Sequence, residues 1–188
     1  MKLVNILKTI VKVAIVLAIL LLLVYGYAYI KYNDPIPSGQ QGAEADALAN
    51  KMLDALNHES YETTNYLEWT FRNSNHFKWS KDKGSCEVIW DDYKVLLNLD
   101  DPSKSNAFVH NFEVHDEQAT ELISIAVDYF NNDSFWLVAP YKVFDPGTER
   151  RLVNLESGQK GLLVTYKSGG STPGDSYLWL LEESGRPY

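Results

Sequence analysis

An apolar N-terminal segment constrains this chain more than any other feature of its sequence. Val13–Ile30 is a run of 18 residues without a charge, preceded by Lys2, Lys8 and Lys12 and followed by Lys31. As a helix it would be about 27 Å long, close to the thickness of the hydrocarbon core of a bilayer. The segment has no polar face with which it could cover a small soluble domain. We therefore expect it to enter a membrane.

The charges beside this segment predict its orientation. Three lysines precede it and one follows it, and positive charge accumulates on the cytoplasmic side of a membrane. Residues 1–12 are therefore expected to be a cytoplasmic stub. Residues 13–31 would then be a transmembrane anchor or a signal peptide, and the remainder of the chain would be exported.

Two interpretations of the segment remain open. As an uncleaved anchor, it would place aromatic side chains at the outer membrane interface, and its outer end carries Tyr25, Tyr27, Tyr29 and Tyr32. As a signal peptide, it would be cleaved near Ala28, because Gly26 and Ala28 are small residues at the spacing of a cleavage site. The apolar run is longer than the roughly 7–15 residues of a signal sequence, which favours the anchor.

The exported part is acidic. Four of the 17 Lys and Arg residues precede residue 32, whereas all 25 Asp and Glu residues follow it, so residues 32–188 carry a net charge of −12. This charge argues against nucleic acid and against an anionic membrane surface as partners. Cys86 is the only cysteine, so no intrachain disulfide can form and the fold must rely on packing.

Residues 32–43 are predicted to be a linker, and residues 44–188 a single domain. The linker combines two prolines with Gly, Gln and Ser, which cannot form a core. In Ala43–His58 the apolar residues recur with a helical period. A second amphipathic helix is predicted for Asp116–Phe130, and Asn131–Asp133 is expected to end it.

Between the two helices the apolar pattern changes to a period of two. Large apolar residues alternate with polar ones over 65–72, 76–80, 86–90 and 93–99. These segments predict four consecutive antiparallel strands joined by tight turns. Phe108–Val114 is ambiguous, and the remaining strands are expected at 151–155, 161–166 and 176–181.

The end of the sequence predicts an unfinished sheet. Glu182–Pro187 has the composition of a hairpin turn, after which Tyr188 would open another strand. An unpaired edge along Tyr177–Leu181 is a feature that natural proteins avoid. We therefore expect a truncated chain with further C-terminal strands or, if the chain is complete, a partner strand at this edge.

The sequence contains no catalytic or metal-binding pattern. The four histidines lack the spacing of a metal-binding helix. The acidic pairs Asp91-Asp92 and Asp100-Asp101 occupy turn positions, and Gly169–Gly174 lacks the lysine and the following helix of a phosphate-binding loop. Cys86 is expected to behave as a small buried apolar residue. We expect no enzyme activity, no metal and no cofactor.

Large aromatic residues are concentrated on one face of the predicted sheet. Such a face either packs completely or leaves an apolar cavity that can bind an acyl chain, and both alternatives remain open. The residues predicted to line a cavity are Trp69, Phe71, Phe77, Trp79, Val88, Trp90 and Trp179.

The order of the elements carries a family resemblance. It is based on 47–56, Tyr66–Arg72, His76–Gly84, Asn132–Gly147 and Gly161–Trp179. In these stretches the chain resembles the lipoprotein-carrier (LolA-like) family, and in particular uncharacterised exported bacterial proteins related to it. The resemblance implies an α+β fold, in which an open antiparallel half-barrel covered by two helices holds lipid in the periplasm.

Together, these features predict a periplasmic domain that an N-terminal helix in the inner membrane holds in place. It would bind a lipid or the acyl chain of a lipoprotein by apolar burial, without catalysis. The carriers of the family are soluble, so the expected anchor sets this chain apart from them. The alternative is an envelope interaction module with a fully packed core and a protein partner.

Overall fold

The computed structural model describes residues 2–33, 35–169 and 172–188 and divides the chain into two compact units. Unit 1 is Met1–Pro37 and unit 2 is Ser38–Tyr188.

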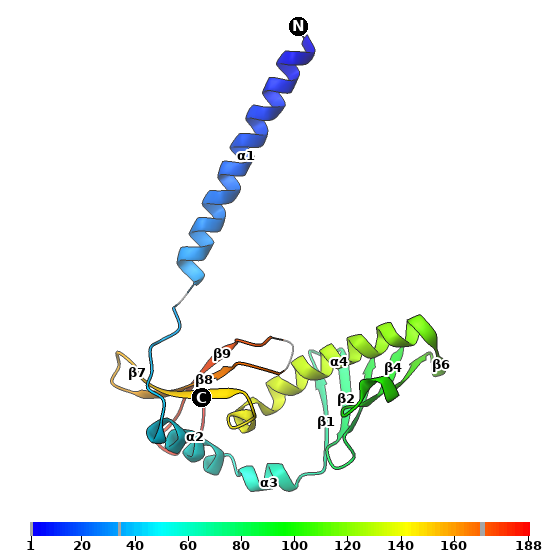
Figure 1. Cartoon of the computed structure of the whole chain (residues 1–188), viewed down its shortest axis with the longest axis vertical. Helices are drawn as coiled ribbons and strands as arrows, with labels where there is room; N and C mark the ends of the chain where they lie inside the picture. The colour runs from blue at the N-terminus through cyan, green and yellow to red at the C-terminus, as the bar shows by residue number, and fades with distance from the viewer. Residues whose placement is uncertain (1, 34, 170–171) are drawn as a thin grey trace. The chain divides into compact units, whose positions relative to one another are not determined.

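Unit 1 consists of a single helix, α1 (Lys2–Tyr32) (Figure 1). Within it, Ile6–Tyr32 is long and apolar enough to cross a membrane, a property that anchors and signal sequences share. At the end of the helix, Tyr25 and Tyr29 stack with ring centroids 6.3 Å apart. Lys31 Nζ lies 5.3 Å from the ring of Tyr32. The predicted long apolar helix with aromatic residues at one end is confirmed.

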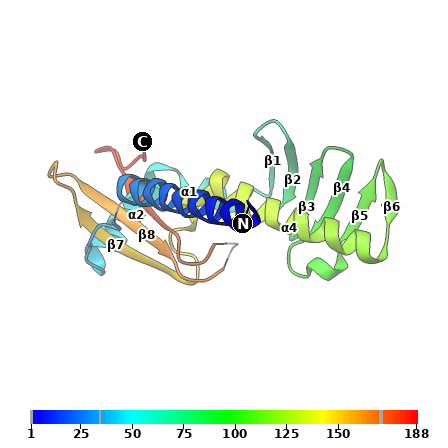
Figure 2. The ribbon, with the colours of Figure 1, turned by 90° about the horizontal axis from the view of Figure 1, so that it is seen from above.

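Unit 2 is an α+β fold with two antiparallel sheets, as Figures 1 and 2 show. Its helices are α2 (Ala43–Ala55), α3 (His58–Thr63) and α4 (Asp116–Val138), with short 3-10 helices η1 (Pro102–Lys104) and η2 (Ala139–Lys142). The first sheet contains β1 (Tyr66–Phe71), β2 (Asn75–Ser80), β3 (Ser85–Trp90), β4 (Tyr93–Asn98), β5 (Asn106–Val109) and β6 (Phe112–Val114). The second contains β7 (Thr148–Asn154), β8 (Lys160–Tyr166) and β9 (Ser176–Leu180).

The six-stranded sheet is a meander in which each strand pairs with the next one in the sequence. The four predicted strands are confirmed, and the ambiguous segment Phe108–Val114 contributes the end of β5 and the whole of β6. The tight turns that join the strands use left-handed residues, among them Asn73, Asp91 and Asn111, with φ between 45° and 68°. Asn and Asp tolerate this conformation better than other residues with a side chain.

One face of this sheet packs against α4, which runs across the strands (Figure 2). Side chains from alternate positions of β2, β3 and β4 meet Leu122, Ala126 and Phe130 of the helix in one core. Phe77, at the centre of this core, is 0% exposed. The apolar stripe predicted for the second helix therefore faces the sheet, as its period requires.

The prediction that Asn131–Asp133 ends this helix is wrong, because α4 continues to Val138. Asp133 is only 3% exposed. Its carboxylate accepts hydrogen bonds from Asn75 Nδ2 (2.9 Å) and Asn132 Nδ2 (2.8 Å). Such partners offset the cost of burying a polar group inside a helix. The apolar aromatic run at 134–138 is therefore helical.

The first predicted helix, Ala43–His58, is also corrected, because α2 ends at Ala55. Asn57 has φ 54°, a left-handed conformation that breaks the helix, and the short helix α3 begins at His58. Ala49, Met52 and Leu53 of α2 pack on the three-stranded sheet and form a second core.

Two further contacts complete unit 2. Gln40 pairs with Leu152 of β7 through two backbone hydrogen bonds, so this part of the expected linker belongs to the folded unit. At the other end, Glu182–Pro187 turns back, and the N–H of Tyr188 donates to the carbonyl of Leu180 (3.2 Å). The end of β9 is thus paired by the chain's own last residues.

An aromatic stack links the short helices α3 and η2 of unit 2. The rings of Tyr61 (α3) and Tyr141 (η2) lie parallel, 4.2 Å apart. Tyr141 donates to the carbonyl of Leu56 (3.1 Å). Lys81, in the turn between β2 and β3, lies 3.9 Å above the ring of Tyr61 and donates to its carbonyl. Burial lowers the pKa of this lysine.

The filled core predicts a large difference between two phenylalanines of the same sheet. Replacing buried Phe77 by Ala should destabilise the protein by about 3–5 kcal/mol, because it leaves a cavity. The matched change Phe112→Ala, at a side chain that is 78% exposed, should cost less than about 0.5 kcal/mol. Urea unfolding of both variants measures the difference, and equal losses would contradict a filled core.

Cys86 provides a second test of this core. Burial raises the pKa of its thiol to about 12, and only the thiolate reacts as a nucleophile. At pH 8 the folded protein should therefore react with an aromatic disulfide reagent at least about a hundredfold more slowly than the urea-unfolded protein. Equally fast labelling of the two forms would show that Cys86 is accessible.

Candidate functional site

The structure divides the seven residues predicted to line a cavity between two cores. Trp179 on β9 packs in the core of α2 and the three-stranded sheet. The other six lie in the core between the six-stranded sheet and α4. These six are Trp69, Phe71, Phe77, Trp79, Val88 and Trp90.

Helix α4 covers the face of the sheet on which these six residues lie. Trp69 stacks on Phe77 with centroids 4.6 Å apart. From α4, Phe130 meets the ring of Trp79 edge to face at 5.3 Å, and Tyr129 meets Trp90 at 5.5 Å. The aromatic face of the sheet therefore packs against rings of the helix and against itself.

An open pocket of about 410 Å³ lies at the C-terminal end of α4. Its walls come from the last turns of this helix, from 142–146, from the end of β8 and from the start of β9. Of the seven predicted lining residues, Trp79 alone borders it. The aromatic residues in its wall are Trp79, Phe130, Phe135, Trp136, Tyr166 and Tyr177. The volume is within the usual range for small-molecule sites, roughly 300–1,000 Å³.

Local structure explains why these residues meet. Asn131, Ser134, Phe135 and Val138 follow the three- and four-residue spacing of one helix face. In the three-stranded sheet Val164 lies opposite Tyr177, so Tyr166, two residues further along, shares its face with Tyr177. Ser134, Phe135 and Val138 reach the two tyrosines of the three-stranded sheet because α4 continues past Asp133.

Four rings form a cluster in the pocket wall. Phe135 lies 5.2 Å from Tyr166 and 5.1 Å from Tyr177. Trp136 lies 5.8 Å from Tyr177, with the two planes at 89°. Trp136 is nevertheless 56% exposed, so its ring is accessible to a ligand. Edge-to-face packing holds the remaining rings in place.

The polar lining consists of one ion pair, one further carboxylate and several uncharged groups. Lys142 Nζ lies 2.7 Å from Asp145 Oδ2. Asp175 accepts a long hydrogen bond of 3.5 Å from the hydroxyl of Tyr177. Burial and this carboxylate raise the pKa of Tyr177, and burial also raises the pKa of Tyr166. Both tyrosines are therefore neutral at physiological pH.

Some polar side chains in the wall make no hydrogen bond with the residues that the structure describes. Among residues 2–33, 35–169 and 172–188, the side chains of Asn131, Ser134, Ser168 and Thr172 have no such partner. The pocket thus combines ring surfaces with polar groups, as small-molecule sites do.

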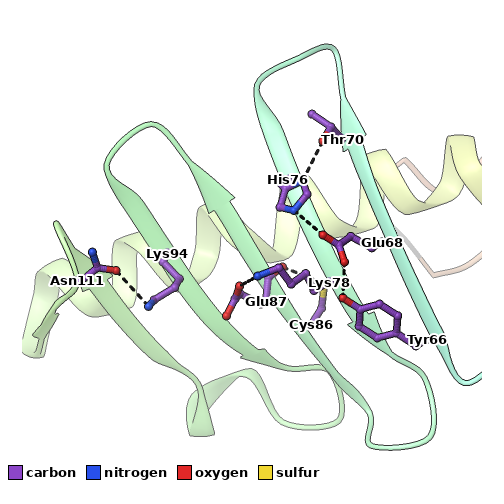
Figure 3. Close-up of polar contacts among 9 residues, drawn as sticks. All are labelled: Tyr66, Glu68, Thr70, His76, Lys78, Cys86, Glu87, Lys94 and Asn111. Atoms are coloured by element: carbon purple, nitrogen blue, oxygen red, sulfur yellow. Dashed lines mark hydrogen bonds and ion pairs between the residues drawn. The ribbon is translucent and has the colours of Figure 1, made fainter.

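A second polar arrangement lies on the face of the six-stranded sheet that points away from α4 (Figure 3). His76 Nδ1 is 2.8 Å from Thr70 Oγ1, and its Nε2 is 3.1 Å from Glu68 Oε1. The hydroxyl of Tyr66 donates to the other oxygen of Glu68 (2.7 Å). This donation, followed by the contact with His76, lowers the pKa of Glu68.

This carboxylate–histidine–hydroxyl order also occurs in hydrolases, where a substrate pocket and oxyanion donors accompany it. Here the four side chains are at least partly exposed on a strand surface. None of them borders the pocket described above. The arrangement fits cross-strand pairing, which stabilises a sheet surface. Within the described part of the chain, no cluster of three or more His, Cys, Asp or Glu side chains could hold a metal ion.

Sequence reasoning missed most of the pocket. Phe135, Trp136 and Tyr166 are conspicuous as large rings, but nothing in their local pattern separates them from core residues. Asp175 lies in a segment with the composition of a loop. The aromatic run at 134–138 was the one usable signal, because Trp136 cannot pack on the same helix face as Phe135.

Comparison with known proteins does not assign the chain to a family. No protein-family model, no curated protein and no solved structure matches it. The function is therefore inferred from the geometry of the pocket and from the apolar N-terminal helix.

Proposed function

We propose that this protein is a membrane-tethered binding domain for a lipid or for the acyl chain of a lipoprotein, and that the pocket at the end of α4 is its binding site. The observation that carries the proposal is this pocket of about 410 Å³, walled by six aromatic side chains. Burial of methylene groups against the rings drives binding, at about 0.8 kcal/mol for each CH₂. Six buried methylenes would contribute about 5 kcal/mol before the entropic cost of association.

The N-terminal helix supports a ligand that comes from a membrane. In the proposal α1 stays in the inner membrane with its N-terminus in the cytoplasm, and unit 2 lies in the periplasm. Seven residues separate Tyr32, at the end of α1, from Gln40, which is paired with β7. Such a segment spans at most about 25 Å. The tether thus keeps the domain close to the lipid surface and raises the local lipid concentration.

The resemblance to the lipoprotein-carrier family is compatible with this proposal. A helix on an antiparallel meander is common to the expectation and to unit 2. A continuous half-barrel that encloses lipid remains a prediction from the sequence.

One observation favours the alternative, an envelope interaction module without a lipid. The aromatic face of the six-stranded sheet is packed, with Phe77, Val88 and Val95 fully buried beneath α4. In that case the pocket would hold part of a protein partner. No catalytic step is proposed in either case.

Anchoring is tested with the full chain. An uncleaved α1 should keep the protein in the membrane fraction after extraction at alkaline pH, and its N-terminal sequence should begin at or near Met1. Cleavage after Ala28 would instead release a soluble protein beginning at Tyr29. That outcome would replace the tethered receptor by a soluble carrier.

Lipid binding is tested by photolabelling. The full chain is placed in nanodiscs containing a phospholipid with a photoactivatable group in its acyl chain. Labelled peptides should include 130–138 and 166–177 in addition to α1. Trp136→Ala should reduce labelling of the pocket by about tenfold, because it removes an accessible aromatic contact.

The matched control is Tyr66→Ala. Tyr66 is 49% exposed, but it lies on the opposite face of the six-stranded sheet from α4. This variant should be labelled like the unmodified protein. Labelling confined to α1 would overturn the proposed lipid site and leave the interaction module.

A further inference from the structure

The pocket wall contains more acidic than basic side chains. Lys142, Asp145 and Asp175 are the charged residues that border the pocket. Lys142 and Asp145 neutralise one another at 2.7 Å. Asp175 has no cationic partner among the described residues, and its one side-chain hydrogen bond there is the long one from the hydroxyl of Tyr177. The pocket therefore carries one net negative charge.

The ring cluster adds negative potential of a second kind. The faces of aromatic rings attract cations, because the ring quadrupole is negative above and below the plane. Tyr166 lies at 84° to Phe135, and Trp136 lies at 89° to Tyr177. Trp136 borders the pocket and is 56% exposed, so a group in the pocket can contact its ring.

We propose that the pocket binds an alkylated ammonium group, the cationic head group of a lipid. This inference rests on the proposed function, in which the same pocket is the lipid-binding site. Ring faces favour an alkylated ammonium, which combines apolar surface with positive charge. Asp175 adds Coulombic attraction and opposes the carboxylate of a fatty acid or an isolated phosphate. The membrane helix α1 favours a lipid as the source over a cationic peptide.

The test compares choline with 3,3-dimethyl-1-butanol, an uncharged alcohol of the same shape in which carbon replaces nitrogen. The full chain is placed in phosphatidylglycerol nanodiscs, which contain no ammonium group. Binding is followed by tryptophan fluorescence, because Trp79 and Trp136 border the pocket. Choline should bind at least about tenfold more tightly than the alcohol. Equal affinities would overturn the proposal.

Two variants identify the source of this preference. Asp175→Asn should weaken choline binding by about tenfold at low salt, and by less at high salt because the carboxylate is exposed and screened. The alcohol should be unaffected. Trp136→Leu keeps an apolar side chain but removes the aromatic ring, so it should also reduce the preference for choline. The control Asp128→Asn changes an exposed carboxylate of α4 that does not border the pocket, and it should change neither affinity.

The outcomes separate this inference from the proposed function. Photolabelling of the pocket without a choline preference would leave the lipid site standing and refute the cationic head group. A choline preference that disappears in Asp175→Asn, in a protein whose pocket is not photolabelled, would refute the acyl-chain site and retain the cation site. A choline preference unchanged in both Asp175→Asn and Trp136→Leu would place the cation elsewhere and overturn the inference.

Discussion

The continuity of α4 through Asn131–Asp133 is the feature on which the rest of unit 2 depends. In an isolated helix these residues would compete with the backbone for hydrogen bonds and favour an end. In the folded protein Asp133 is buried and accepts a hydrogen bond from Asn75, the first residue of β2. A contact across 58 residues of sequence thus allows the helix to continue. It also fixes the edge of the six-stranded sheet to the helix.

A single helix thereby performs two tasks. Residues 122–130 of the helix pack on one face of the meander, where the small residue Ala126 is fully buried and Phe130 meets Trp79 edge to face. Its last turns extend beyond the sheet and place Phe135 against Tyr166 and Tyr177. The packed core and the open pocket are therefore consequences of the same element. A helix that ended at Phe130 would leave the three-stranded sheet without these contacts.

The strands could be predicted because their signal is local. Alternation of apolar and polar residues over five or six positions defined β1 to β4, and turn residues such as Asp91 separated them. The predicted end of the first helix is a few residues too late, because the apolar period alone extends to His58 whereas Asn57 adopts the left-handed conformation and breaks the helix. The second helix was cut short because the partner of Asp133 is remote in sequence. The pocket combines rings of α4 and β8 with Asp175 beside β9, and no local pattern relates these segments.

The amino-acid sequence by itself determined the long apolar N-terminal helix, the acidic character of residues 32–188 and the antiparallel meander with an amphipathic helix. These properties depend on composition and on the short apolar periods of helices and strands, which are local features of the sequence. Only the tertiary structure decided which aromatic residues are packed and which border open space. Burial of a ring depends on the residues opposite it, and for Phe135, Tyr166 and Tyr177 those residues come from distant parts of the chain. The position of the pocket therefore follows from how far α4 extends, and a part-buried hydrogen bond between Asn75 and Asp133 supports that extension.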